Sequence, residues 1–494
     1  MYSLGIDIGS SSVKVSLLDI QSGKCVAAAT NPKTEAPITA VRKGWAEQSP
    51  DMWWIQILNG VAEIAAAGYS MYEVGCIGIT YQMHGLVAVG ADGKPVRDAI
   101  IWCDSRAVDT GAKAFDSIGR EKCLEHLLGS PGNFTASKLA WVKENEPAIF
   151  SKIVRFMLPG DYIAYKLSGK VATTETGLSE QTLWDFKDGR RADFVADYFG
   201  FSPNLIPSTV PSIGVQAVTN ADTQALLGIP EGTPISYRAG DQPNNAFSLN
   251  VLRPGEIAAT GGTSGVVYGV TDIPKADPFS RVNTFLHVNH TAQEPRLGVL
   301  LCINGTGILN SWIHRNICPE LSYPQMNELA ASAPAGSDGL TILPFGNGAE
   351  RVLEGRSTGA ALGGVDLVRH SRAHILRATQ EGIAFSFLYG IDVMRGLGLN
   401  PAVIRAGRAN LFLSPLFRRT LATVCGSTIE LLDTDGSLGA ARGAALGAGY
   451  YKTPEEAFST LAVVGREEPD PSWKAALDEA YSRWKNNLES ILNQ

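Results

Sequence analysis

Long apolar runs and clustered basic residues are both missing from this sequence. No apolar run reaches about 18 residues, the length a membrane span needs, and no basic segment followed by an apolar run stands at its start. We therefore expect neither a membrane span nor secretion. The formal net charge is −7 and no stripe of Lys and Arg is present, so nucleic acid is not an expected partner.

Paired cysteines are also absent. The 7 cysteines are scattered along the chain, and none forms a Cys-x-x-Cys pair. No disulfide framework is therefore indicated. The largely apolar surroundings of these residues are typical of buried, reduced thiols, and the cytoplasm is the expected location.

Two common nucleotide-binding signatures are missing as well. The chain has no Gly-x-x-x-x-Gly-Lys-Ser/Thr segment, so we do not expect a P-loop that holds a whole triphosphate at one helix N-terminus. Gly346-Asn347-Gly348 lacks the rest of a dinucleotide fingerprint, which argues against a Rossmann site. In a protein that is acidic overall, any anionic ligand must be held locally.

The composition that remains is that of a large globular protein. Hydrophobic residues make up 45% of the chain and charged residues 18%, which is ordinary for folded proteins. With 494 residues, the chain exceeds the size at which one hydrophobic core keeps growing. We therefore expect two large domains, or at most three smaller ones, with a crevice between them.

Two hairpins of the same plan occur near the start of each half of the chain. Residues 2–8 and 13–18 read as apolar strands joined by the turn Gly9-Ser10-Ser11-Ser12, and residues 257–268 repeat strand, hydroxyl-rich turn and strand. Such a recurrence is expected when two related domains face each other across a cleft. We divide the chain into domains 1–245 and 246–455, and expect 456–494 to be an amphipathic helical segment that packs back on the body.

Helical and strand patterns alternate along the rest of the chain, which is typical of an α/β protein. The patterns predict helices at 50–67, 134–144, 371–395 and 436–450 and near the C-terminus, and strands at 75–80 and 403–404. Thr453-Pro454-Glu455-Glu456 carries a capping box with proline at the first helical position.

Asp7 stands inside the first apolar strand. A carboxylate is unfavourable there unless a hydrogen-bond network, a cation or a metal compensates its charge. The neighbouring Gly/Ser turn suits a phosphate, because it presents several N–H and hydroxyl groups towards one point; a tight hairpin without a ligand is the alternative. A phosphate-bound Mg²⁺ that meets Asp7 through water would supply the missing partner. Lys14 is either a solvated lysine at the strand end or a phosphate ligand.

Six motifs follow one another between residues 5 and 441. They are Gly5-Ile6-Asp7-Ile8-Gly9-Ser10, Gln82-Met83-His84-Gly85, Trp102-Cys103-Asp104-Ser105-Arg106, Gly240-Asp241-Gln242, Gly262-Thr263-Ser264-Gly265 and Gly436-Ser437-Leu438-Gly439-Ala440-Ala441. Together they resemble the FGGY carbohydrate kinases, and within that family they are most similar to the members that phosphorylate D-xylulose. The resemblance implies an α/β fold of two actin-like, ribonuclease-H-like domains, with ATP, Mg²⁺ and the sugar in the central cleft.

The resemblance also implies residues that act on the sugar. Asp241 is similar to the family's general base, which accepts the proton of the C5 hydroxyl as that oxygen attacks the γ-phosphate, giving D-xylulose 5-phosphate and ADP. The residues alone leave other interpretations open. Asp241 could cap the next helix, His84 could be a structural histidine, and Asp104 and Arg106 could form an ion pair that supports the pocket. The implied sugar contacts are Met83, His84, Gly85, Trp102, Asp104, Arg106, Asp241 and Gln242.

For ATP, the resemblance implies two phosphate hairpins and a nucleoside floor, with Asp7 as the metal ligand. The small residues of the floor are equally suited to close packing of a helix on a sheet. The implied ATP contacts are Gly9, Ser10, Ser11, Ser12, Lys14, Gly262, Thr263, Ser264, Ala406, Gly407, Asn410, Gly436 and Gly439.

Three segments depart from the family pattern. Gln242 follows the base where the D-xylulose kinases usually have asparagine, so a kinase of another ketose or polyol, such as ribulose or glycerol, is an alternative. Residues 405–410 replace a glycine triplet. Only Glu350 and Arg351 remain of a Gly-Glu-Arg-Thr-Pro segment, and their role is unassigned.

Two further expectations concern class and assembly. A non-catalytic, actin-like nucleotide-binding protein is the alternative from a different class, and the sugar loop and Asp241 argue against it. For the assembly, the resemblance alone suggests a homodimer.

Overall fold

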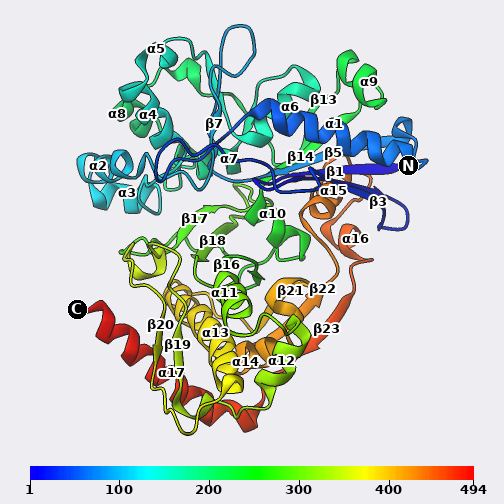
Figure 1. The fold of residues 1–494 in the computed structure, drawn as a ribbon. Helices are drawn as coiled ribbons and strands as arrows, with labels where there is room; N and C mark the ends of the chain where they lie inside the picture. Colours follow the sequence, from blue (N-terminus) through cyan, green and yellow to red (C-terminus); the bar gives the residue numbers. More distant parts are fainter. Residues whose placement is uncertain (494) are drawn as a thin grey trace.

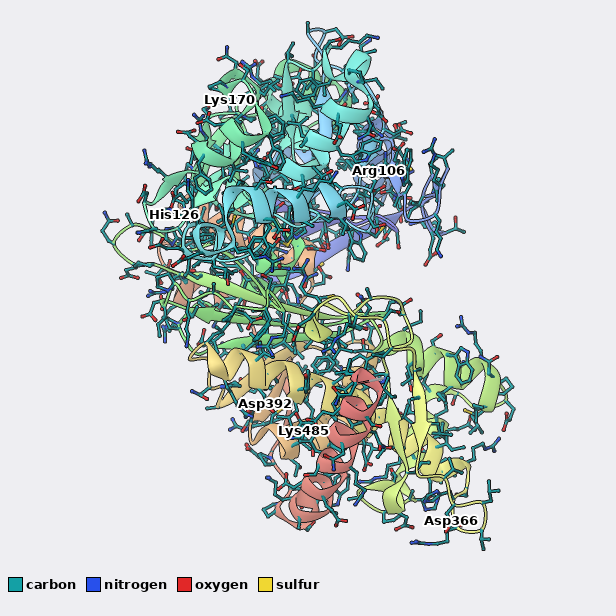
Figure 2. All side chains as sticks on the ribbon, turned by 90° about the vertical axis from the view of Figure 1, so that its left-hand side faces the viewer. Arg106, His126, Lys170, Asp366, Asp392 and Lys485 are labelled. Atoms are coloured by element: carbon teal, nitrogen blue, oxygen red, sulfur yellow. The ribbon has the colours of Figure 1, made fainter. Side chains whose placement is uncertain are left out.

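Two mixed β-sheets, one in each lobe, organise the computed structural model, which describes residues 1–493. The chain enters the upper lobe first and reaches the lower lobe in its second half (Figure 1). The view turned by 90° separates the same two lobes, with Arg106, His126 and Lys170 on the upper one and Asp366, Asp392 and Lys485 on the lower one (Figure 2).

The N-terminal sheet has six strands in the order β13-β14-β5-β1-β2-β3. Its three central strands run parallel, whereas the strands outside them pair antiparallel. The strands are β1 (Tyr2–Ile8), β2 (Val13–Asp19), β3 (Lys24–Asn31), β5 (Val74–Tyr81), β13 (Ile213–Val218) and β14 (Pro234–Gly240).

The C-terminal sheet repeats this topology with one strand added. Its order is β17-β18-β16-β15-β21-β22-β23, and its parallel strands β15, β21 and β22 take the places of β1, β5 and β14. The two hairpins that the sequence predicted are therefore the first two strands of a repeated sheet. The strands are β15 (Ile257–Gly261), β16 (Gly265–Thr271), β17 (Asn283–Leu286), β18 (Leu297–Ile303), β21 (Val403–Gly407), β22 (Thr428–Leu432) and β23 (Val463–Glu467).

Helices cover both sheets and confirm the alternating pattern of the sequence. In the upper lobe they are α1 (Pro50–Ala66), α2 (Val108–Ile118), α3 (Arg120–His126), α4 (Thr135–Asn145), α5 (Pro147–Phe150), α6 (Pro159–Ser168), α7 (Glu175–Glu180), α8 (Asp193–Phe199) and α9 (Ala221–Leu227). After them come α10 (Asp241–Ser248), α11 (Gly307–Ile317), α12 (Tyr323–Ala331), α13 (Arg372–Gly396), α14 (Pro415–Cys425), α15 (Gly436–Gly447), α16 (Pro454–Phe458) and α17 (Pro471–Leu492).

Short elements complete the chain. None of the helices in residues 1–493 combines the length and the apolar character that crossing a membrane requires. The short strands are β4 (Glu47–Gln48), β6 (Val87–Val89), β7 (Ala99–Ile100), β8 (Arg155–Met157), β9 (Thr173–Thr174), β10 (Trp184–Asp185), β11 (Arg190–Arg191), β12 (Thr209–Val210), β19 (Thr341–Leu343) and β20 (Ala361–Gly363).

The C-terminal helix α17 packs on the lower lobe, as its amphipathic pattern predicts. Leu477, Trp484 and Leu488 are buried in the same core as the inner face of α13 and α14. The indole N–H of Trp484 donates a hydrogen bond to the carbonyl oxygen of Ile342, at 3.0 Å. This helix therefore anchors β19 as well as the helices around it.

Helix α15 follows the C-terminal sheet in the chain but packs against the N-terminal sheet, across β1, β5 and β14 (Figure 1). Glycines in the sheet make this close approach possible. A Cβ atom on Gly5 would lie 1.8 Å from the carbonyl oxygen of Ser437, and one on Gly78 would lie 2.0 Å from that of Ala440. The small residues of 436–447 therefore serve helix-on-sheet packing, which was one of the two interpretations of this segment.

Helix α10 lies between the two sheets. It follows β14 directly and contacts α15 and β5 on one side and β15 and β16 on the other. Its first residue is Asp241. The only carboxylate in the first turn of α10 is thus held where the two lobes meet.

We expect Gly78→Ala to destabilise the protein, because its new methyl group has no space against the backbone of α15. Overpacking of this kind costs about 1–3 kcal/mol, so the thermal melting temperature should fall by several degrees. Gly396→Ala at the end of α13 is the matched control, since no atom lies within 4 Å of its added Cβ. Equal melting temperatures for the two variants would contradict the close contact of α15 with the sheet.

Candidate functional site

Asp7 and Asp241 lie at the same edge of the N-terminal sheet. Asp7 is the penultimate residue of β1, and Asp241 directly follows β14. Because β14, β5 and β1 are parallel neighbours, their carboxyl ends meet at one edge. The structure therefore brings together the two carboxylates that the sequence singled out.

The carboxylate of Asp7 has no hydrogen-bond donor among residues 1–493. Burial raises its pKa to about 7, and the charges of Asp241 and Asp435 add to this effect, while Lys14 opposes it. Gly436 leaves the space beside it open, because a Cβ there would lie 2.3 Å from Oδ2 of Asp7. A recessed carboxylate without a donor fits the requirement for a cation, so these residues suit hydrated Mg²⁺.

Asp241 is held in a form that can accept a proton near neutral pH. Burial raises its pKa to about 6, and hydrogen bonds from the backbone and side chain of Gln242 oppose the shift. Above pH 6 the group is mostly ionised, and its pKa lies closer to neutrality than that of an ordinary aspartate. The general-base role of Asp241 stays a prediction.

The turn after β1 connects the predicted phosphate loop to the predicted sugar pocket. The amide of Gly9 donates to the carbonyl oxygen of Ser12 at 3.0 Å, which closes the turn. The indole N–H of Trp102 lies 3.4 Å from Oγ of Ser10, and the side chain of Gln48 donates to the carbonyl oxygen of Ser10. Ser11 is exposed.

Lys14 pairs with Asp435, the N-cap of α15, and is neither free in solvent nor unpaired. Each side chain keeps 35% of its surface exposed. Lys14 is also the cross-strand neighbour of Asp7 on the hairpin. The ion pair therefore keeps the ammonium group of Lys14 near Asp7 without giving Asp7 a hydrogen bond.

A pocket of about 1200 Å³ opens between the lower lobe and a loop of the upper lobe. Of the predicted ATP residues, Gly262, Thr263 and Asn410 line it. Sequence reasoning missed the other walls, although the strand–Gly–helix pattern at 297–307 signals a phosphate loop. Those walls include Glu35, Gly307, Ile308, Asn310, Ser311, Arg315, Tyr323, Asn327, Leu411, Ser414, Arg419 and Trp473.

The remaining predicted ATP residues lie outside the lining of this pocket. Ser264 follows Thr263 in the β15–β16 turn, and Ala406 and Gly407 end β21. Gly439 packs against α10, since a Cβ there would lie 2.4 Å from Cβ of Ser248. Gly436 lies beside Asp7. Their contact with a nucleotide stays a prediction.

The predicted sugar loop is buried at the end of β5. Met83 is 4% exposed and lies against Gly240, where a Cβ would be 2.5 Å from Cγ of Met83. The ring of His84 meets that of Phe134 edge to face at 4.5 Å and lies 5.3 Å from that of Phe285. Burial lowers the pKa of His84 to about 3, so the ring is neutral.

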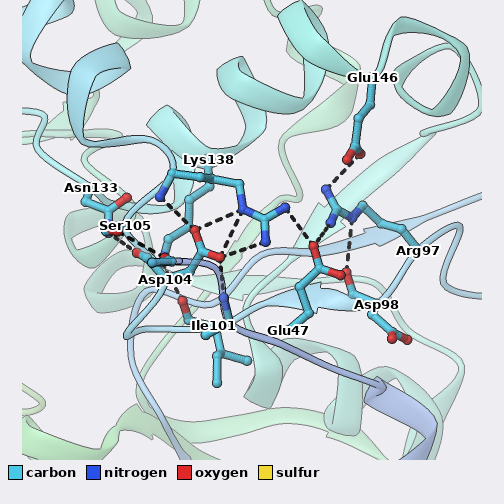
Figure 3. A network of polar contacts seen from close by, with 12 residues as sticks. Glu47, Arg97, Asp98, Ile101, Asp104, Ser105, Asn133, Lys138 and Glu146 are labelled. Atoms are coloured by element: carbon cyan, nitrogen blue, oxygen red, sulfur yellow. Dashed lines mark hydrogen bonds and ion pairs between the residues drawn. The ribbon is translucent and has the colours of Figure 1, made fainter. Parts of the chain in front are cut away.

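Asp104 and Arg106 form a buried ion pair, which was the alternative to direct sugar contact. Nε and Nη2 of Arg106 donate to Asp104 at 3.0 and 2.7 Å, and the amide of Ala46 donates to the same carboxylate at 2.6 Å. Arg106 also pairs with Glu47, which Arg97 bridges to Glu146 (Figure 3). The side chains of Asp104 and Arg106 are both at most 1% exposed.

Glu350, whose role the sequence left open, supports the loop before α11. Its two carboxylate oxygens accept the amide N–H groups of Asn304 and Gly305, each at 2.9 Å. Burial raises its pKa to about 7, and these two hydrogen bonds oppose the shift. Glu350 therefore fixes the backbone that leads to Gly307 in the wall of the pocket.

The duplicated sheet and the pocket between the lobes define a protein of the actin-like ATPase fold. Residues 2–248 match the model of the FGGY family of carbohydrate kinases, N-terminal domain, and residues 257–451 match that of the C-terminal domain. The chain belongs to the FGGY family of carbohydrate kinases.

Curated relatives cover almost the whole chain. It is 28% identical over 467 residues to the xylulose kinase of Bacillus subtilis, covering 92% of this chain and 90% of that protein. It is 26% identical over 498 residues to the xylulose kinase of Escherichia coli, covering 100% and 99%.

Solved structures share the fold. The xylulose kinase of Rhodospirillum rubrum has a TM-score of 0.88 and 25% identity, with 100% of both chains covered. The glycerol kinase of Plasmodium falciparum, solved with ADP, has a TM-score of 0.87 and 19% identity, with 100% and 98% covered. Because kinases named for different substrates fit equally well, the fold does not select the substrate.

We expect Asp104→Ala to lower the unfolding free energy by about 3–5 kcal/mol, because it leaves the guanidinium of Arg106 buried with one partner fewer. Asp116→Ala is the matched control. It removes an Asp–Arg pair with side chains 62% and 68% exposed, and such pairs contribute about 0–1 kcal/mol. Thermal melting measures the loss of stability in both variants. A stable Asp104→Ala protein that has lost only sugar affinity would favour direct sugar contact instead.

Proposed function

We propose that this protein transfers the γ-phosphate of ATP to the C5 hydroxyl of D-xylulose, giving D-xylulose 5-phosphate and ADP. The observation that carries the proposal is the meeting of Asp7 and Asp241 at one edge of the sheet, where the parallel strands β1 and β14 end on either side of β5. Two such carboxylates suit two different tasks at one reacting centre: one can bind a cation and the other can accept a proton.

In this proposal Asp241 is the general base. Its carboxylate accepts the proton of the C5 hydroxyl as the oxygen forms a bond to the γ-phosphorus and the bond to ADP breaks. Gln242 opposes the upward shift in the pKa of Asp241. Since phosphoryl transfer depends chiefly on alignment and charge stabilisation, the residues that align sugar and phosphate should matter at least as much as the base.

The nucleotide is proposed to occupy the large pocket, with its phosphates towards Gly9–Ser12 and Gly262–Ser264. Mg²⁺ bound to the phosphates would neutralise their charge and meet Asp7 through water. Glu350 supports this proposal, because it orders the loop from which Gly307 and Ile308 reach the pocket.

The choice of sugar rests on Met83-His84-Gly85 and on the relatives. Trp102 and Gln242 are proposed to complete the sugar contacts, while Asp104 and Arg106 support the pocket through their ion pair. Relatives named xylulose kinase match nearly the full chain. D-ribulose and glycerol are the runner-up substrates because of Gln242.

Two finer proposals accompany the activity. The 7 free cysteines, of which Cys76, Cys123, Cys318 and Cys425 are buried, support a reducing compartment, and we propose the cytoplasm. The domain division at 245–246 and a homodimer are likewise proposals. The segment 456–494 is not wholly helical, because β23 within it pairs with β22 in the C-terminal sheet. Analytical ultracentrifugation would decide the assembly.

A substrate panel with coupled ADP detection tests the function. D-xylulose should give a kcat/KM at least tenfold above that of D-ribulose, D-fructose and glycerol, and phosphorus NMR should locate the new phosphate on C5. A higher kcat/KM for ribulose or glycerol would reassign the substrate. Filament growth with ATP and no turnover of any sugar would favour the non-catalytic alternative.

A further inference from the structure

Two buried ionisable side chains from different helices hold the backbone of His84. Glu180, the last residue of α7, accepts the amide N–H of His84 on Oε1 at 3.3 Å. Lys138 of α4 donates from Nζ to the carbonyl oxygen of His84 at 2.9 Å. Glu180 is 2% exposed and Lys138 0%, and within residues 1–493 neither forms an ion pair. Burial of two such groups without ion pairs is unfavourable, so they indicate a functional requirement.

His84 needs this support because its backbone is strained. Its φ of 60° lies in the left-handed region, which costs a residue other than glycine about 1–3 kcal/mol. Its ring is fixed as well. Nδ1 lies 3.0 Å from the carbonyl oxygen of Glu180, and since a carbonyl oxygen only accepts, Nδ1 carries the proton. The neutral ring therefore keeps a lone pair on Nε2, which can accept a hydrogen bond from a sugar hydroxyl.

The second oxygen of Glu180 reaches the neighbouring strand. Oε2 would lie 2.6 Å from a Cβ atom on Gly240, so it lies beside the residue that precedes Asp241. Gly240 pairs with Tyr81 across β14 and β5. One carboxyl group thus spans the ends of two adjacent strands, one leading to His84 and the other to Asp241.

We propose that Glu180 is a positioning residue of the sugar site. Its carboxyl group fixes the His84 peptide and lies beside Gly240, so that His84 and Asp241 can contact the same sugar molecule. Lys138 fixes the other side of His84 through its hydrogen bond to the carbonyl oxygen. This inference rests on the proposed function, and it concerns sugar binding, not the chemical step.

The surroundings of Glu180 favour its uncharged form. Burial raises its pKa well above the usual range, and Asp161 and Asp241 add to the effect, while the amide of His84 and the charge of Lys138 oppose it. Asp161 is itself paired with Arg238, at 3.1 Å. A protonated carboxyl still accepts the N–H of His84 on its carbonyl oxygen. Glutamine is therefore the conservative replacement.

The test compares Glu180→Gln with Glu180→Leu, using D-xylulose and ATP. Glu180→Gln keeps a neutral acceptor, so its KM values should stay within about threefold of those of the wild type. Its pH profile should have the same shape as that of the wild type. Glu180→Leu removes the acceptor at similar volume, and we expect its KM for D-xylulose to rise at least tenfold while its KM for ATP stays within twofold. Lys138→Met, which removes the donor on the other side, should raise the same KM. Thermal melting accompanies each variant.

Three results would overturn the proposal. These are an unchanged KM for D-xylulose in Glu180→Leu, a Glu180→Gln enzyme as impaired as Glu180→Leu, and equal increases in both KM values with a lowered melting temperature. A wild-type protein that phosphorylates no sugar would contradict the proposed function instead. Calorimetric binding of D-xylulose to the wild-type protein and the Glu180 variants would then decide the role of Glu180.

Discussion

The gathering of partly buried carboxylates at the end of the N-terminal sheet is the constraint on which the rest of the site depends. Burial raises the pKa of Asp7 to about 7, and the nearby charges of Asp241 and Asp435 add to this effect. Lys14 pairs directly with Asp435 and so stabilises only part of this charge. A folded protein that keeps such a group without a hydrogen-bond donor has a site that a bound cation would stabilise.

Close packing holds these charges in place. Helix α15 lies on the N-terminal sheet because glycines on β1 and β5 let the two backbones approach, and its N-terminus brings Asp435 and Gly436 beside Asp7. Helix α10 carries Asp241 between the two sheets. The same edge of the sheet also supports the sugar loop, where Glu180 and Lys138 stabilise a strained histidine. The proposed proton acceptor, cation site and sugar loop therefore share one framework.

Much of the fold follows from local sequence patterns, and the site follows from them only in part. Alternating apolar residues predict both hairpins, and the small-residue and amphipathic patterns predict α15 and α17, all of which the structure confirms. The packing of α15 on Gly5 and Gly78 could not be predicted, because the partners lie far apart in the sequence and no local signal links them. Glu180 and Lys138 stand in ordinary helical patterns, so their burial depends entirely on tertiary contacts. Glu350 became interpretable only once its contact with Asn304 and Gly305 was known.

The most direct test of the account is the stability and turnover of Asp241→Asn across pH. The pKa of Asp241 is raised from 3.8 to about 6, so ionisation destabilises the folded protein as pH rises through this range, by up to about 3 kcal/mol. The variant lacks this penalty. It should therefore melt higher than wild type at pH 8 and equally at pH 4, while its turnover falls at least about a hundredfold. A variant that melts lower at pH 8, or that keeps full turnover, would contradict the central role of Asp241.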